Sequence, residues 1–325
     1  MKKWKLWMML LISSLIVGAC SSNSSSTDSS GSEDLFVTIA TGGTSGVYYP
    51  IGGAMASVFE EALGIDTSVQ STGASIENIN LITNDLAELA ITMSDAVQQA
   101  YEGSGAFEGE TPNENLRGLI SLYPNYVQIV TTKDSGIETV YDLKGKRVGV
   151  GAPNSGVELN ARIILDAYGL TYDDMEVDYL SYKESIDQMK NGMIDAAFVT
   201  SGIPNSTVID LATSHDVEII PIEGKELEKL TSEYSFFIEG TIPKGTYENE
   251  EDISTVSIMN ILLVNKNLSE EVVYDLTKAI FEHIDDIHAS HNSAKNITLD
   301  TATDGMVVPL HPGAEKYLKE KGVIE

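Results

Sequence analysis

Four short segments rich in glycine and in hydroxyl or amide side chains could bind an anion. Each lies between an apolar run and a predicted helix, and they read TGGTSG at 41–46, STGAS at 71–75, GAPNSG at 151–156 and TSGIPNS at 200–206. A helix N-terminus carries free backbone N–H groups and about half a positive charge, so such ends bind carboxylates and phosphates. Several such helix N-termini around one cleft predict a small anionic or zwitterionic ligand. For any single segment the alternative is that its polar residues only cap the helix.

Two charged residues could add to such a site. Asp95 follows a predicted buried strand and could pair with a ligand ammonium, or it could be an acid that the dipole favours at a helix start. Arg162, within a predicted helix, could reach a ligand carboxylate, although we expect a structural ion pair instead.

The chain has no pattern typical of an enzyme. Segment 41–46 matches neither the P-loop nor the dinucleotide fingerprint, and no G-x-S-x-G nucleophile elbow occurs. His283, His288 and His291 lie near Asp285 and Asp286. Asp285, His288 and His291, spaced by three residues, could share a helix face and bind a metal. We favour a solvated helix end instead, and we expect no catalytic residue, no cofactor and no metal.

The N-terminus predicts an exported lipoprotein. Residues 1–19 have the layout of a signal peptide, with lysines at the start, an apolar stretch and small residues before Cys20. The apolar stretch is shorter than the roughly 20 residues of a transmembrane helix. VGAC at 17–20 resembles a lipobox, so we expect Cys20 to be lipidated; a plain signal peptide with an incidental cysteine is the alternative. The serine-rich residues 20–34 then form the lipid anchor and a flexible tether.

Composition limits the partners of the remaining chain. The formal net charge of −29 opposes binding to nucleic acid and to anionic lipid headgroups. The 42% of hydrophobic residues suit a soluble core, and Cys20 is the only cysteine, so no internal disulfide can form.

Apolar runs and turn residues predict alternating strands and helices. The predicted strands are 35–41, 65–71, 89–92, 116–122, 126–132, 147–150, 175–180, 196–199, 217–221, 236–242 and 258–264. The predicted helices are 48–63, 75–83 with Ser75 as N-cap, 94–101, 155–168, 181–191, 204–212, 269–287 and 314–321. Repeated βαβ units predict an α/β fold with parallel sheets in two lobes and a ligand cleft between them. We expect the first lobe at 35–124 plus 235–325 and the second at 125–234, with the chain returning near 233–243.

Longer stretches resemble the TAXI family, the extracytoplasmic solute receptors of tripartite ATP-independent periplasmic (TRAP) transporters. The resemblance covers the mature chain in order, through ATGGTSGVYYPIGGAMASVF (40–59), STGASIENINLI (71–82), ELAITMSDAVQQAY (88–101), LRGLISLYPNYVQIV (116–130), DLKGKRVGVGAPNSGVELNARIIL (142–165), MKNGMIDAAFVTSGIPNSTV (189–208), IPKGTY (242–247) and AKNITLDTATDGMVVPLHPGAEKYLKEKG (294–322). It implies a type II periplasmic-binding-protein fold whose two lobes move about a hinge.

The resemblance also implies the ligand positions. They are Thr44, Ser45, Gly46, Tyr48, Gly73, Ala74, Ser75, Ser94, Asp95, Pro153, Asn154, Ser155, Gly156, Val157, Ser201 and Pro204. We expect backbone N–H groups at Ser45–Gly46 and Ser155–Gly156 to hold carboxylate oxygens, and Tyr48 to pack on the ligand and offer its hydroxyl. The sequence departs from the family pattern twice, because Ala74 stands where glycine is expected and Gln128 where histidine or a similar residue is expected.

The resemblance implies a receptor that captures a small carboxylate and delivers it to a separate TRAP permease, and for this chain we expect an amino acid such as glutamate or glutamine. We therefore expect a monomer held at the outer face of the cell membrane by lipidated Cys20, with the permease subunits as partners. A type II binding protein that serves an ABC importer or a sensor kinase is the alternative.

Overall fold

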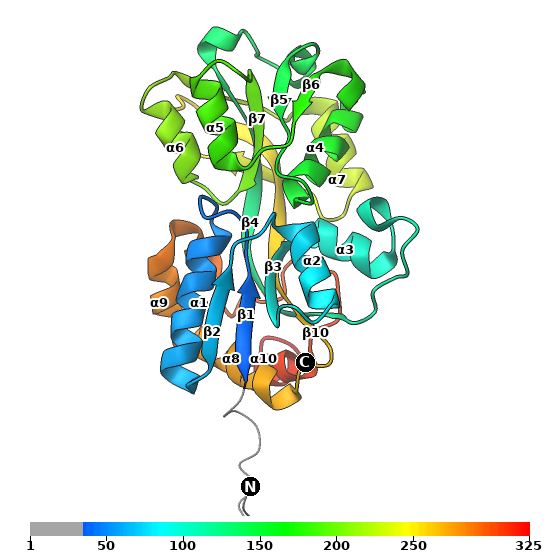
Figure 1. Cartoon of the computed structure of the whole chain (residues 1–325), viewed down its shortest axis with the longest axis vertical. Helices are drawn as coiled ribbons and strands as arrows, with labels where there is room; N and C mark the ends of the chain where they lie inside the picture. Colours follow the sequence, from blue (N-terminus) through cyan, green and yellow to red (C-terminus); the bar gives the residue numbers. More distant parts are fainter. Residues whose placement is uncertain (1–34) are drawn as a thin grey trace, which may run out of the picture. The chain divides into compact units, whose positions relative to one another are not determined.

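Residues 35–325, the part of the chain that the computed structural model describes, build one mixed β-sheet with helices on its faces (Figure 1). The strands are β1 Phe36–Ala40, β2 Asp66–Gln70, β3 Leu89–Met93, β4 Leu116–Thr132, β5 Arg147–Gly149, β6 Glu176–Asp178, β7 Ala196–Ser201, β8 Val217–Ile220, β9 Ile238–Ile242 and β10 Ile253–Asn265. The predicted signal peptide, Cys20 and the tether to residue 34 lie outside these residues. No helix within the described range is long and apolar enough to cross a membrane.

Most of the helices lie where the sequence predicted them. They are α1 Tyr48–Leu63, α2 Ser75–Thr83, α3 Ser94–Glu102, α4 Gly156–Ala167, α5 Tyr182–Lys190, α6 Ser206–Ala212, α7 Gly224–Glu233, α8 Glu270–Glu282, α9 Ile284–Ser290 and α10 Pro312–Glu320. Short 3-10 turns occur at Gly105–Phe107, Lys133–Ser135, Val140–Leu143, Tyr172–Asp174 and Asn292–Asn296.

The sheet has two parallel ends joined by antiparallel strands. Its order is β2-β1-β3-β10-β4-β7-β5-β6, with β8 added to β4 and β9 added to β10. Strands β2, β1 and β3 pair in parallel at one end, and β7, β5 and β6 pair in parallel at the other. We call the elements around β1–β3 the first half and those around β5–β8 the second half.

The two halves share the long strands β4 and β10. We predicted two strands separated by Pro124, but β4 is continuous over 17 residues. Its first part pairs with β10, and its later part pairs with β7 and β8. Pro124 is tolerated because it faces Met259 beside a register shift between Met259 and Ile261, where the hydrogen-bond ladder is already interrupted.

The return to the first half occurs later than predicted. Strand β9 pairs with the beginning of β10 and does not itself run back. The strand that continues into the first half is β10, whose later residues pair with β3 and β4. Residues 253–257 still lie on the side of the second half, because Val256 packs in its core and the Ser254 carbonyl accepts a hydrogen bond from the Ile222 N–H.

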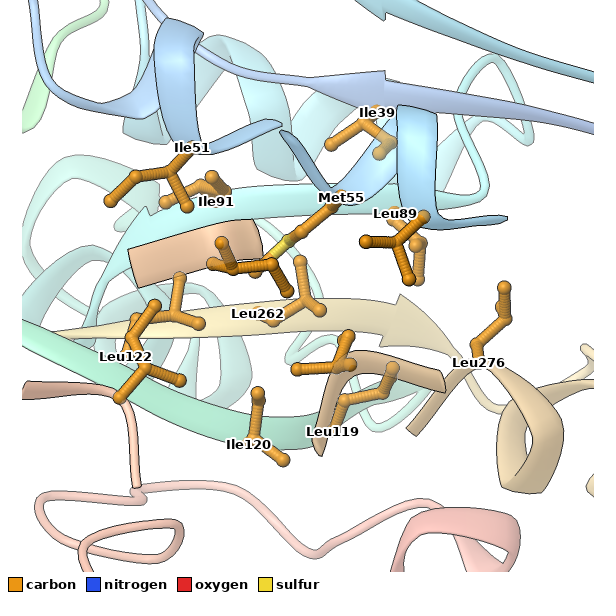
Figure 2. Close-up of a cluster of buried hydrophobic side chains, with 14 of the residues drawn as sticks. Ile39, Ile51, Met55, Leu89, Ile91, Leu119, Ile120, Leu122, Leu262 and Leu276 are labelled. Carbon is orange, nitrogen blue, oxygen red and sulfur yellow. The ribbon is translucent and has the colours of Figure 1, made fainter. Parts of the chain in front are cut away.

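Each half has its own buried apolar side chains. In the first half, α1 lays Ile51 and Met55 against Ile39 and Leu89 of the sheet (Figure 2). Both helix residues are fully buried, and their spacing of four places them on one helix face. In the second half, Val148, Ala196 and Phe198 of the sheet pack with residues of α4 and α7.

Three helix predictions were wrong in detail. The predicted helix 269–287 is broken at His283, so that α8 packs on α10 and α1 while α9 packs on α1 and the turn Asn292–Asn296. Helix α7 was missed because half of its residues are charged and the only apolar residues that it buries are Leu227 and Leu230. Ser75 is the first residue of α2 rather than its N-cap, and its hydroxyl accepts a hydrogen bond from the Met93 N–H.

Candidate functional site

A cavity of about 80 Å³ lies between the two halves, beside the starts of α1, α2 and α4. Its walls come from the first half through the segments before α1 and α2, and from the second half through the segment before α4, the start of α5 and the end of β7. The lining residues are Gly42, Gly43, Ser45, Gly46, Val47, Tyr48, Thr72, Gly73, Ala74, Met93, Asn125, Ala152, Ser155, Val157, Ser181, Tyr182, Thr200 and Ser201.

All four glycine- and hydroxyl-rich segments reach this cavity, because the sheet brings the carboxyl ends of their strands together. Half of the predicted ligand residues line it: Ser45, Gly46, Tyr48, Gly73, Ala74, Ser155, Val157 and Ser201. The other half do not: Thr44, Ser75, Ser94, Asp95, Pro153, Asn154, Gly156 and Pro204.

Several of these other residues lie where the two halves touch. The Glu77 N–H of α2 donates to the Asn154 carbonyl at 3.3 Å. A Cβ on Gly73 would lie 2.9 Å from the Pro153 carbonyl, and one on Gly156 would lie 2.3 Å from Met93 Cε. At Gly73 the close neighbour is backbone, so the approach of the second half leaves no room for a side chain there, whereas at Gly156 the close neighbour is the flexible end of Met93. Thr44 is exposed, and Pro204 follows a cis peptide bond next to the start of α6.

Asp95 is part of the same contact between the halves and not of the cavity wall. It is fully buried at the start of α3, and its Oδ2 accepts a hydrogen bond from Asn160 Nδ2 of α4 at 2.5 Å. Burial raises the pKa of Asp95 to about 7, although its backbone and Asn160 hydrogen bonds oppose this shift. Asp95 Oδ1 and Asn160 Oδ1 have no hydrogen-bond partner. In this geometry Asp95 joins α3 to α4 instead of presenting a carboxylate to a ligand.

Two tyrosines line the cavity, and the hydroxyl of each is hydrogen-bonded to the protein. Tyr48 donates to Asn260 Oδ1 at 2.5 Å, and Tyr182 donates to the Thr200 carbonyl at 2.6 Å. Burial raises the pKa of both hydroxyls above the ordinary tyrosine value, so both stay protonated donors. The Tyr48 hydroxyl, which was predicted to bond to a ligand, is thus bonded to the protein. Only the Tyr48 ring is left to contact a ligand.

A chain of amide groups fixes the orientation of Asn125 in the cavity wall. The Tyr123 carbonyl can only accept, and it receives a hydrogen bond from Asn260 Nδ2 at 2.7 Å. Asn260 Oδ1 therefore faces Asn125, whose Nδ2 donates to it at 3.1 Å. Asn125 Oδ1 is left without a partner, as is Thr200 Oγ1 of the same cavity wall. Both oxygens are enclosed from water, so each lacks a hydrogen bond that burial normally requires.

Sequence reasoning missed Asn125 and Tyr182 entirely. Asn125 lies within a continuous strand, where no turn or helix start marks it. A signal did exist, because an asparagine beside Pro124 in a largely apolar segment is unusual for a core position. Tyr182 was placed only as the beginning of a helix, and its ring reaches the cavity because α5 starts at this residue.

The predicted backbone donors are partly used inside their own segments. The Gly46 N–H donates to the Gly43 carbonyl, and the Ser155 N–H donates to the Ala152 carbonyl. Gly156 and Val157 begin α4, so helix geometry provides no carbonyl four residues before them to accept their N–H groups. Ser155 Oγ accepts from the Glu158 N–H and caps the helix.

The two departures from the expected family pattern differ in consequence. Gln128 lies away from the cavity, where its Oε1 accepts a hydrogen bond from the Tyr247 hydroxyl. Ala74 lines the cavity at φ 80° and ψ −143°, a backbone region that glycine adopts and other residues rarely do. The expected glycine at this position therefore has a physical reason, and Ala74 carries backbone strain.

The cavity wall has no charged side chain among its residues in the described part of the chain. Arg162 forms an ion pair with Glu158 at 2.6 Å and lies over the Tyr172 ring. The prediction that Arg162 makes a structural ion pair is therefore confirmed. Charge in a bound ligand would accordingly meet helix N-termini and neutral dipoles only.

Comparison with known proteins identifies the family. Residues 39–322, most of the chain, match the NMT1-like family. The chain belongs to the NMT1-like family. A solved structure of a protein from Bordetella bronchiseptica RB50 is 18% identical to this NMT1-like chain, with a TM-score of 0.54 over 88% of this chain and 82% of that chain. The structure of a periplasmic transporter is 12% identical, with a TM-score of 0.53 over 89% of this chain and 93% of that chain.

The similarity to these two solved structures concerns the fold, and it agrees with the strand order of the sheet. The NMT1-like chain has the mixed α/β type II periplasmic-binding-protein fold that the resemblance implied.

The histidine cluster of this NMT1-like protein does not form a metal centre. His288 Nε2 bonds to the Ile297 carbonyl, and His291 Nδ1 accepts from the Ser293 N–H. Between residues 35 and 325, no group of three or more His, Cys, Asp or Glu side chains is arranged to hold a metal ion.

Proposed function

We propose that this chain is an extracytoplasmic receptor of the TAXI type, which captures a small carboxylate and delivers it to a TRAP permease. The observation that carries the proposal is the cavity between the two halves, lined by the starts of α1, α2 and α4. Three helix N-termini around one cavity favour an anionic group there. The protein then acts as a binding protein, not as an enzyme.

The proposed capture step is closure of two lobes about a hinge. We propose that these lobes are the first and second halves, with the hinge where β4 and β10 pass between them, so that the second lobe extends to about residue 257 and does not end at 234. Contacts such as Asp95 with Asn160 and Glu77 with Asn154 would break on opening, since each joins one half to the other. Ligand in the cavity would favour the closed arrangement by contacting both halves at once.

Within the class of small carboxylates, glutamate and glutamine follow from the resemblance to TAXI receptors. The ammonium of such a ligand was expected to meet Asp95. Because Asp95 instead bonds Asn160 outside the cavity wall, support for an amino acid now rests on the resemblance alone.

The proposed location is the outer face of the cell membrane, with lipidated Cys20 as the anchor and the serine-rich tether as the link to the folded residues. An anchored monomer stays close to the permease, which raises its effective concentration there.

Calorimetry tests the receptor function directly. The purified protein, freed of bound solute by unfolding and refolding, should bind at least one small carboxylate with a stoichiometry of one. Addition of that solute and protein to vesicles containing the permease should then give uptake. Binding of sugars or peptides with no response to any carboxylate would refute the proposal.

A further inference from the structure

The strands that join the two halves are interrupted at one point between them. Strands β4 and β10 pair at Ser121 with Ile261 and again at Pro124 with Met259. Between these pairs β4 has two residues and β10 has only Asn260, so a β-bulge breaks the ladder of hydrogen bonds. Pro124 also has no N–H group to donate to β10. The pairing of the two strands is therefore weak at this bulge.

The bulge lies at the boundary between the halves. Asn260 is the first residue of β10 that pairs with β3, and Tyr123 belongs to the apolar core of the first half. Tyr126, shortly after the bulge, pairs with Ser201 of β7 in the second half. The other register shift of β10, after Leu262, lies further inside the first half. Only the bulge at Asn260 therefore has one half on each side of it.

The side chain of Asn260 bridges the interruption. Asn260 is fully buried, and its Nδ2 donates to the Tyr123 carbonyl at 2.7 Å, on one side of Pro124. Its Oδ1 accepts from Asn125 Nδ2 at 3.1 Å, on the other side of Pro124. The same Oδ1 accepts from the Tyr48 hydroxyl of α1 at 2.5 Å. One amide thus holds both sides of Pro124 and the start of the first helix.

Asn260 is linked to the cavity, although it does not line it. Its two donors, Tyr48 and Asn125, are both lining residues. A turn of β4 at Pro124 moves Asn125 relative to Asn260, whereas the bond between Asn260 and Tyr123 stays within the first half. A solute that contacts Tyr48 and Asn125 together favours the arrangement in which both side chains bond to Asn260.

We infer that the pivot of closure is the bulge at residues 122–124 and 259–260, and that Asn260 is a positioning residue that couples this pivot to the cavity wall. Asn260 does not contact the solute. It acts by holding Tyr48 and Asn125 in the places that they occupy when the halves are closed. The inference rests on the proposed receptor function through the closure which that function requires.

Distances between spin labels on the two halves test the pivot without any solute. The labels are attached at two exposed positions, through Glu61→Cys on α1 and Asp210→Cys on α6, in a chain that also carries Cys20→Ser. Asn260→Leu should broaden the distribution of distances and shift it to longer values, because the two sides of Pro124 are no longer held together.

Matched variants separate a pivot from a general loss of stability. Asn265→Leu is the control for Asn260→Leu, because Asn265 is buried on the same strand and donates to Ile82 and Asp85, away from the bulge. It should keep the wild-type distances. An equal shift in this control would overturn the inference.

A milder variant covers the case in which Asn260→Leu does not fold. Asn125→Ala leaves the bonds of Asn260 to Tyr123 and Tyr48 in place, and it should shift the distances in the same direction as Asn260→Leu. Ser121→Ala, on the same strand and outside the cavity wall, should leave them unchanged. Wild-type distances in Asn125→Ala would overturn the inference, as would wild-type distances in a folded Asn260→Leu.

Calorimetry tests the coupling to the cavity with the tightest binder among glutamate, glutamine, succinate and butyrate. Tyr48→Phe removes the hydroxyl that bonds to Asn260 and should weaken binding about three- to tenfold, the effect of one lost hydrogen bond. In the Asn260→Leu background it should cause no further loss, since the acceptor is already missing. An equal loss in both backgrounds would refute the coupling. Absence of binding by the wild type would refute the receptor function, and the spin-label distances would still decide the pivot.

Discussion

At the scale of single residues, the most informative side chain is Asp95. Its buried carboxyl joins α3 to α4 through Asn160, and burial raises its pKa to about 7. Burial therefore favours the protonated acid, whereas the hydrogen bond from Asn160 favours the carboxylate.

Stability should depend on the protonation of Asp95. Its pKa is higher in the folded protein than the ordinary value of 3.8, so the folded state binds more protons than the unfolded chain between about pH 4 and 7. The free energy of unfolding should then fall as pH rises through this window, by up to about 1.4 kcal/mol per pH unit, and Asp95 should add no slope above about pH 7.

Urea unfolding from pH 4 to 8 checks this dependence by comparing Asp95→Asn with the wild type. The variant should lose the Asp95 part of the slope, whereas Asp285→Asn, at an exposed position of α9, should retain it. Identical slopes in wild type and Asp95→Asn would show that the carboxyl is ionised in the folded protein.

A second prediction concerns the backbone strain at Ala74. Backbone strain at its positive φ costs about 1–3 kcal/mol, whereas glycine adds an entropic cost of up to about 1 kcal/mol. Ala74→Gly should therefore raise the free energy of unfolding by about 1 kcal/mol in urea titrations. Ala54→Gly, in the interior of α1, is the control of opposite sign and should lower it by about 1 kcal/mol. A loss of stability in Ala74→Gly would contradict the strain.

At the scale of elements, the start of α4 decides how closely the halves approach. Gly156 lies against Met93 of β3 and Ser75 of α2, and a Cβ there would be 2.3 Å and 3.0 Å from their nearest atoms. Opening of the halves can relieve such a clash without disturbing the apolar cores on either side.

Gly156→Ala should accordingly weaken ligand binding by about 1–3 kcal/mol, the usual cost of overpacking, and change the melting temperature of the free protein little. Gly53→Ala, on α1 where no atom lies within 4 Å of the new Cβ, is the control and should bind as the wild type does. Calorimetry gives the affinity and scanning fluorimetry the melting temperature. Wild-type affinity in Gly156→Ala would argue against closure at this contact.

At the scale of the whole molecule, the proposed anchor predicts where the protein is found. Cys20→Ser should remove the acylation site and move the protein from the detergent phase to the aqueous phase in Triton X-114 partition of cell extracts. Binding of the carboxylate by the variant should be unchanged, since Cys20 precedes the folded residues. Partition of wild type and variant into the same phase would refute lipidation at this cysteine.

The sequence alone determined the local elements and the segments that meet at the cavity. The bounds predicted for α1 and α2 were correct, because apolar spacing and flanking glycines report local geometry directly. The four glycine- and hydroxyl-rich segments also converge as expected, because the two parallel sets of strands run in opposite directions and their carboxyl ends meet at the cavity.

Only the tertiary structure decided which of these residues face the cavity and which join the halves. Asp95 and Gly156 were expected to meet a ligand, but they belong to the contact between α3, α4 and β3. Asn125 could not be found from the sequence, because its role depends on Asn260, which is 135 residues away. Hydrogen bonds and close approaches between distant segments are set by packing of the whole sheet, and local sequence patterns do not record them.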